Sequence, residues 1–164
     1  MAPPDEALAV GLGEARVSCE PGEILVAYGL GSCLAICMVD PVARVSGLLH
    51  AVLPKRANGA EALSPKYVDS GIAGLLARMA GAGAERKRLV VRMAGGASML
   101  TAPGLKPLLN IGDRNIIAAR AAFAALGLKV AAEDVGGTTG RLVRLYIATG
   151  RVTVYKMGSP EREF

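Results

Sequence analysis

The chain has 164 residues, a net charge of +5 and a single histidine, and its residues are 52% hydrophobic and 20% charged. This length and balance are typical of one folded domain and exclude an intrinsically disordered chain. Aromatic residues make up only 4% of the chain and the basic residues are scattered, which argues against nucleic-acid binding. No apolar run reaches the roughly 18 residues of a membrane span, and no secretory signal is visible, so we expect no membrane insertion.

The first part of the chain predicts strands at residues 15–19 and 24–28, followed by a turn at 29–32 that contains two glycines. Residues 33–53 then predict a β-hairpin. Two apolar runs flank Asp40-Pro41-Val42-Ala43, in which aspartate and proline occupy the positions that they prefer in a turn.

The second part predicts two long helices. Ser64 and Pro65 have the residue types of an N-cap and a first helical position, so the first helix is expected to run from there to about Ala80. The second helix is expected at about 113–125; it opens at Asn110–Asp113 and is closed by Gly127. Further strands are expected at 89–93, 128–132, 142–148 and 151–157, the last two as a hairpin.

About seven strands and two long helices, with more hairpins than βαβ units, predict an α+β fold, or a layered α/β fold, with a mixed sheet. No internal repeat or domain boundary is evident, so residues 1–164 are expected to form a single domain. Its ordered core should span about 15–157 between polar termini.

Cys33 and His50 are the residues to which chemistry can be assigned. If Pro41 and Val42 form the centre of a two-residue turn, Cys33 lies directly opposite His50 on one face of the hairpin. A cysteine attacks as the thiolate, whose formation a neighbouring imidazolium favours, and the imidazole can then act as general acid and base. The Gly31-Ser32 turn and the N–H of Cys33 could supply oxyanion donors.

These residues could instead have a structural role, because a cysteine in an apolar run is usually a small core residue. We expect that role for Cys19 and Cys37, while a lone histidine in a strand can also be a core residue. The three cysteines show neither a disulfide framework nor zinc-site spacing, so a reducing cytoplasm and no metal or cofactor are expected. The charged cluster 85–88 is expected to be a solvated face, or a docking site for an acidic partner.

Five short motifs occur in a characteristic order between residues 20 and 157. They are Gly31-Ser32-Cys33, the hairpin to His50 and Leu53-Pro54, Ala94-Gly95-Gly96-Ala97-Ser98-Met99, Asn110-Ile111-Gly112-Asp113-Arg114-Asn115 and Glu133-Asp134-Val135-Gly136-Gly137. Together they resemble the chemoreceptor glutamine deamidase family, CheD.

This resemblance implies a protein-glutamine deamidase, a hydrolase of chemotaxis adaptation in the cytoplasm. It would convert glutamines on the helical bundles of methyl-accepting chemotaxis receptors to glutamates, with Cys33 as nucleophile and His50 as general acid and base. The resemblance also implies a CheC-type response-regulator phosphatase as a partner of some members. The fold would resemble that of deamidating toxins, with two mixed β-sheets packed together and flanking helices.

The chain departs from the family pattern at Ala27, six residues before the cysteine. Family members commonly carry a threonine there, regarded as the third catalytic residue, and alanine has no hydroxyl with which to orient an imidazole. Either another group, such as a backbone carbonyl, holds His50, or turnover is reduced. The alternative function is therefore a regulatory module that binds receptors or the phosphatase with little catalysis.

Overall fold

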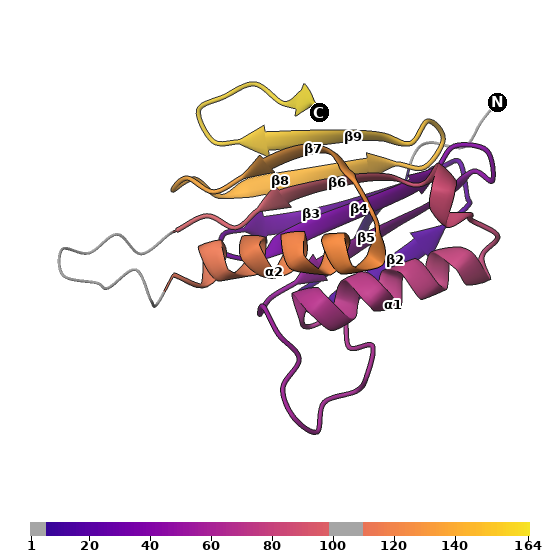
Figure 1. Cartoon of the computed structure of the whole chain (residues 1–164). Coiled ribbons are helices and arrows are strands. Elements are labelled where there is room, and N and C mark those ends of the chain that lie inside the picture. Colours follow the sequence, from indigo (N-terminus) through magenta and orange to yellow (C-terminus); the bar gives the residue numbers. More distant parts are fainter. Residues whose placement is uncertain (1–5, 99–109) are drawn as a thin grey trace.

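Residues 6–98 and 110–164 are described by a computed structural model, in which two five-stranded β-sheets pack against each other and two helices cover one outer face (Figure 1). The first sheet has the order β1 (Glu6–Ala9), β3 (Glu23–Leu30), β8 (Arg141–Tyr146), β9 (Arg151–Lys156), β10 (Arg162–Glu163). The second has the order β2 (Glu14–Ser18), β5 (Val45–Ala51), β4 (Leu34–Asp40), β6 (Val90–Gly95), β7 (Val130–Val135). The β1–β3 and β6–β7 pairs are parallel and the others antiparallel, so both sheets are mixed and the predicted α+β class is confirmed.

Strand β4 lies at the centre of the second sheet and separates two hydrophobic layers. Its alternate residues Leu34, Ile36 and Met38 face helices α1 (Val68–Gly81) and α2 (Ile111–Leu126). Ala35 and Cys37 face the first sheet. Every residue of β4 is buried because both faces of this sheet are covered. A strand buried on both faces has a nearly continuous apolar sequence instead of an alternating one.

Helix α1 begins at Val68, so the prediction that it starts at Ser64 and Pro65 was wrong. The segment before it is held in an extended conformation, because the carbonyl of Lys66 accepts hydrogen bonds from the N–H groups of Val52 and Leu53. Tertiary pairing therefore outweighs the local capping signal. The apolar face predicted for this helix is buried at Val68, Ile72, Leu75 and Met79.

Helix α2 is bounded as the sequence predicts. The side chain of Asn110 accepts a hydrogen bond from the N–H of Asp113, which satisfies one free donor of the first turn. Gly127 ends the helix in the left-handed conformation, with φ of 68°. The final hairpin is also confirmed, as β8 and β9.

The pattern predicted no strand at β1 or β10, which are short edge strands without a clear alternation of apolar residues. Cys19 is exposed, so its assignment to the core was wrong, whereas Cys37 is buried as expected. Residues 1–5 and Met99 lie outside the described residues. Within the described part of the chain, no helix is long and apolar enough to cross a membrane.

Candidate active site

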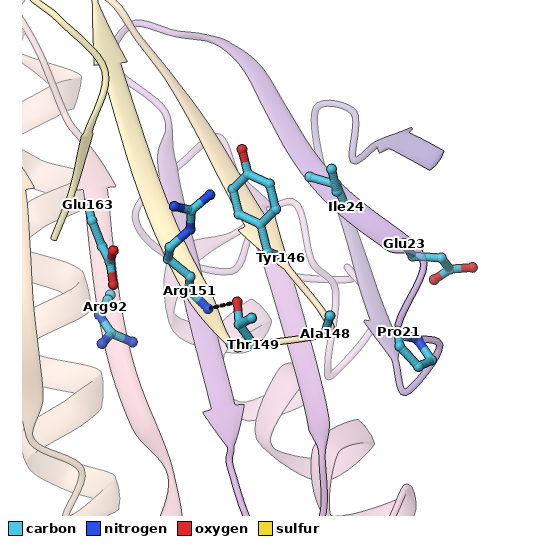
Figure 2. Close-up of a pocket in the computed structure, with 10 residues that line it drawn as sticks. Pro21, Glu23, Ile24, Arg92, Tyr146, Ala148, Thr149, Arg151 and Glu163 are labelled. Carbon is cyan, nitrogen blue, oxygen red and sulfur yellow. Dashed lines mark hydrogen bonds between the residues drawn. The ribbon is translucent and has the colours of Figure 1, made fainter. Parts of the chain in front are cut away.

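Cys33 and His50 do not line the hollow shown in Figure 2. A hollow of about 440 Å³ lies at the beginning of β3, and its lining includes Tyr146, Arg151 and Glu163 (Figure 2). Cys33 follows the other end of the same strand. The site predicted from the sequence is therefore built on the opposite end of β3, and the hollow in Figure 2 belongs to a different region.

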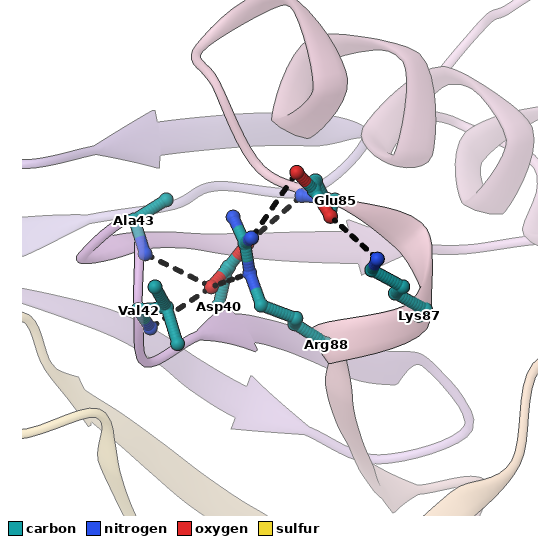
Figure 3. A network of polar contacts seen from close by, with 6 residues as sticks. All are labelled: Asp40, Val42, Ala43, Glu85, Lys87 and Arg88. Carbon is teal, nitrogen blue, oxygen red and sulfur yellow. Dashed lines mark hydrogen bonds and ion pairs between the residues drawn. The ribbon is translucent and has the colours of Figure 1, made fainter.

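The turn between β4 and β5 sets the register of the predicted Cys33–His50 pair. The carboxylate of Asp40 accepts hydrogen bonds from the N–H groups of Val42 and Ala43, and it is also bound by Arg88 (Figure 3). Arg44 adopts φ of 56°, and the loop has four residues, not two. The assignment of the 85–88 cluster to a solvated face was therefore wrong for Arg88, because its half-buried guanidinium binds the buried carboxylate of Asp40.

The longer loop shifts the hairpin register by two residues. His50 pairs with Ala35, so the prediction that Cys33 lies directly opposite His50 was wrong. Because side chains alternate with a period of two, the shift leaves both residues on the same face of the sheet. Cys33 is then the diagonal neighbour of His50, and diagonal neighbours have a separation of about 7–8 Å. Both lie in the layer between the two sheets, where Cys33 joins the buried apolar cluster.

His50 is held by a backbone carbonyl. Its Nδ1 lies 2.9 Å from the carbonyl oxygen of Val10, which can only accept a hydrogen bond, so Nδ1 carries the proton. Nε2 is then the unprotonated nitrogen, and it has no hydrogen-bond partner among the described residues. This arrangement provides a fixed imidazole with a free basic nitrogen.

Ala27 lies in this same layer, fully buried on β3. The N–H of Val10 donates to the carbonyl of Val26, the residue before Ala27. The backbone of β3 next to Ala27 therefore lies beside the segment whose carbonyl holds His50. Sequence reasoning could not find Val10, because a backbone carbonyl has no residue-type signal.

Burial favours the neutral forms of both groups. It raises the pKa of the Cys33 thiol, although the residue's own backbone N–H opposes this by stabilising the thiolate. Burial lowers the pKa of His50, while the Val10 carbonyl and the charge of Glu14 oppose that change. Burial also raises the pKa of Cys37 to about 12, as expected of an inert core thiol. Both shifts therefore favour a neutral thiol and a neutral imidazole over a preformed ion pair.

The backbone at residues 31–33 is held by hydrogen bonds that its carbonyl groups accept. The carbonyl of Gly31 accepts from the N–H of Ala97, and that of Cys33 accepts from the N–H of Gly96, both at 2.9 Å. Asn115 donates to the carbonyl of Ser32. No N–H of residues 31–33 donates to a partner elsewhere in the described part of the chain, so these groups can serve an oxyanion.

An ion cluster centred on the buried Asp134–Arg141 pair adjoins this end of the sheets, and the sequence pattern predicted no role for its members. Asp134 pairs with Arg141 at 2.8 Å, with Lys156 at 3.3 Å and with Arg162. Asp134 lies near the end of β7 in the second sheet, whereas its three partners lie in the first sheet. The cluster therefore ties the two sheets together. Among the described residues, no group of His, Cys, Asp and Glu side chains is placed to hold a metal ion.

The sequence is similar to known chemotaxis proteins. The family described as CheD chemotactic sensory transduction matches residues 52–156. A protein of Symbiobacterium thermophilum named probable chemoreceptor glutamine deamidase CheD is 47% identical over 157 residues, which cover 94% of this chain and 95% of that protein. The chemoreceptor glutamine deamidase CheD of Thermotoga maritima is 40% identical over 154 residues, covering 93% and 94%. A match of this extent over nearly the whole of both chains shows that this protein belongs to the CheD family.

Proposed function

We propose that the protein is a glutamine deamidase that converts glutamine side chains of chemoreceptors to glutamates. Its relatives carry that name, and the described residues supply the parts that the reaction needs. The observation that carries the proposal is that Cys33 lies diagonal to His50 on one face of the sheet, and that Nδ1 of this histidine is already held by Val10. That hydrogen bond leaves Nε2 free to accept the thiol proton.

In the first half of the reaction, Nε2 of His50 takes the proton of Cys33 as Sγ attacks the carboxamide carbon of the substrate. A carbon–sulfur bond forms, and the carbonyl oxygen becomes an oxyanion that the N–H groups of residues 31–33 can stabilise. The imidazolium then returns the proton to the departing nitrogen, which leaves as ammonia. A thioester between Cys33 and the substrate remains.

In the second half, a water molecule attacks the thioester and His50 takes its proton. The tetrahedral intermediate expels the thiolate of Cys33, which recovers a proton from the imidazolium. The product is a carboxylic acid, which releases its remaining proton to solvent to become glutamate, and the enzyme returns to its neutral resting state. Each step uses only Cys33, His50 and backbone N–H groups, so the mechanism calls for no cofactor.

The substrate is the helical bundle of a chemoreceptor, and the setting that fits such a substrate is the cytoplasm. A CheC-type response-regulator phosphatase is a further partner that the family resemblance implies. The positive net charge of +5 suits an acidic receptor surface.

The test incubates the protein with a purified cytoplasmic fragment of a chemoreceptor and follows conversion of glutamine to glutamate by mass spectrometry. We expect conversion with the wild type and with Cys19→Ser, whose thiol is exposed and remote from the reaction, and none with Cys33→Ala or His50→Ala. Binding of the fragment is measured in parallel. Binding without conversion by the wild type would refute the deamidase and favour the regulatory module.

A further inference from the structure

Asn115 is a fully buried polar residue of helix α2 beside the nucleophile. Its Nδ2 donates to the carbonyl of Ser32 at 2.8 Å and to the carbonyl of Val52 at 3.0 Å. Ser32 immediately precedes Cys33, and Val52 directly follows Ala51, which pairs with Leu34, the residue after Cys33. One amide group therefore bridges two backbone segments, the one before β4 and the one after β5, next to the nucleophile.

The orientation of this amide follows from its partners. Both acceptors are carbonyl oxygens, so the atom facing them must be the nitrogen, with each of its hydrogens used. Oδ1 is buried and has no partner among the described residues. A buried acceptor without a hydrogen bond destabilises a fold. Asn115 is therefore poorly explained by stability alone.

The bond to Ser32 acts directly on Cys33. The carbonyl of Ser32 and the N–H of Cys33 belong to one planar trans peptide unit, in which the two groups point in opposite directions. Holding the carbonyl toward α2 therefore directs the N–H of Cys33 away from the helix. Burial raises the pKa of the Cys33 thiol, and a hydrogen bond from this same N–H opposes the rise by stabilising the thiolate.

Close packing of α2 makes this reach possible. A Cβ atom at Gly112 would lie 2.5 Å from the carbonyl oxygens of Gly96 and Ala97, so only glycine lets the first turn of the helix approach this segment. Asn115 lies three residues later on the same side of the helix. The Asn110–Asn115 motif therefore places the side-chain amide of Asn115 against the turn before the nucleophile.

We propose that Asn115 is a positioning residue that fixes the Ser32–Cys33 peptide, and through it the N–H donor that serves the thiolate and the oxyanion. The inference rests on the proposed deamidase function. It assigns to the side chain no contact with the substrate. It predicts that loss of the amide donor impairs the chemical step and the acidity of the thiol while substrate binding persists.

The experiment compares Asn115→Ala and Asn115→Asp with the wild type; aspartate keeps the shape but lacks the two N–H donors. The pH dependence of Cys33 alkylation gives the thiol pKa, measured in a Cys19→Ser, Cys37→Ala background so that one thiol reacts. Steady-state deamidation gives kcat and KM. We expect a raised thiol pKa in both variants, a kcat lowered by about tenfold to a hundredfold, and little change in KM.

Phe123→Ala is the matched control, because Phe123 is buried on the same helix but belongs to the core on the helix side. It should lower the melting temperature and leave the thiol pKa and kcat unchanged. Asn115 variants with the wild-type thiol pKa and kcat would overturn the proposal, as would equal effects in Phe123→Ala. If one Asn115 variant does not fold, the other decides. If the wild type deamidates nothing, the proposed function fails, while the alkylation profiles still test Asn115.

Discussion

The carbonyl oxygen of Val10 lies 2.9 Å from Nδ1 of His50 and fixes which nitrogen of the imidazole carries the proton. A group that orients a catalytic histidine need not be a side chain, because any acceptor at that distance selects the tautomer. Val10 follows β1, which pairs with β3 of the first sheet, whereas His50 lies on β5 of the second sheet. The histidine is therefore held by a bond across the two sheets, next to the strand that carries Ala27.

Replacing Ala27 with threonine should change deamidation little, by less than about threefold in kcat, because Val10 already binds the Nδ1 proton and a second acceptor adds little. Kinetics with a receptor fragment measure this directly, with Ala27→Val as the control for added volume in the fully buried site. A gain of an order of magnitude in Ala27→Thr but not in Ala27→Val would show that the missing hydroxyl limits the enzyme.

The pH dependence of catalysis should follow the neutral form of His50. Burial lowers its pKa below the ordinary 6.5, so kcat/KM should rise with pH through an inflection below 6.5 and be level at neutral pH. The thiol pKa of Cys33 is raised above 9.0, so its alkylation without substrate should still be increasing at that pH. An acid inflection above pH 7, or alkylation that is already level at neutral pH, would indicate an ion pair in the resting site.

The candidate site shows which parts of a structure a sequence can predict. The alternation of β4 and β5 correctly predicted that Cys33 and His50 share a face, because that property depends only on the parity of the loop length. The alternation could not predict that the two residues are offset by two positions along the strands. This register depends on the loop, in which Asp40 accepts hydrogen bonds from two N–H groups and pairs with Arg88, a residue far away in the sequence. The side-chain pattern predicts the face, and long-range contacts decide the register.

The same distinction applies at the helices. Asn110 and Gly127 cap α2 through interactions within its own ends, and the sequence predicted both. At α1, the signal at Ser64 was overridden because Lys66 pairs with a segment that is remote in sequence. The Val10 carbonyl and the amide of Asn115 also act across the fold, so neither role could be predicted from local pattern.

Asp40→Asn should destabilise the protein at neutral pH and reduce its sensitivity to acid. Hydrogen bonds from Arg88 are the largest cause that keeps the pKa of Asp40 far below 3.8, and the N–H groups of the turn add to them. A carboxylate with a depressed pKa contributes stability above pH 3.8, and this contribution is lost as pH falls below that value. Between pH 7 and pH 2.5 the difference in melting temperature between the wild type and the variant should therefore shrink as the pH falls below 3.8. Parallel curves would contradict this.

Asp134→Asn should weaken the attachment between the sheets. The variant leaves Arg141 buried without its counter-charge, and removing one partner of a buried pair costs about 3–5 kcal/mol. Denaturant unfolding measures this loss. Glu133→Gln is the matched control, because its pair with Arg120 is largely exposed and contributes little. Equal losses of unfolding free energy in the two variants would show that the cluster does not stabilise the fold as inferred.

Gly95→Ala should abolish most of the deamidase activity. Gly95 adopts φ of 115°, and a Cβ atom there would overlap the carbonyl oxygen of Cys33, so the backbone of the nucleophile must move. A displacement of this kind can reduce the rate by about a hundredfold.

Gly158→Ala is the matched control, because its φ is 84° but a Cβ atom there has nothing within 4 Å. Both variants carry backbone strain and should lose stability, so melting temperatures are measured beside activity. Loss of activity in Gly95→Ala alone, at a temperature where both variants are folded, would show that the Gly95–Cys33 contact holds the nucleophile in place. Full activity in Gly95→Ala would show that the nucleophile tolerates this movement and that its position is set by other contacts.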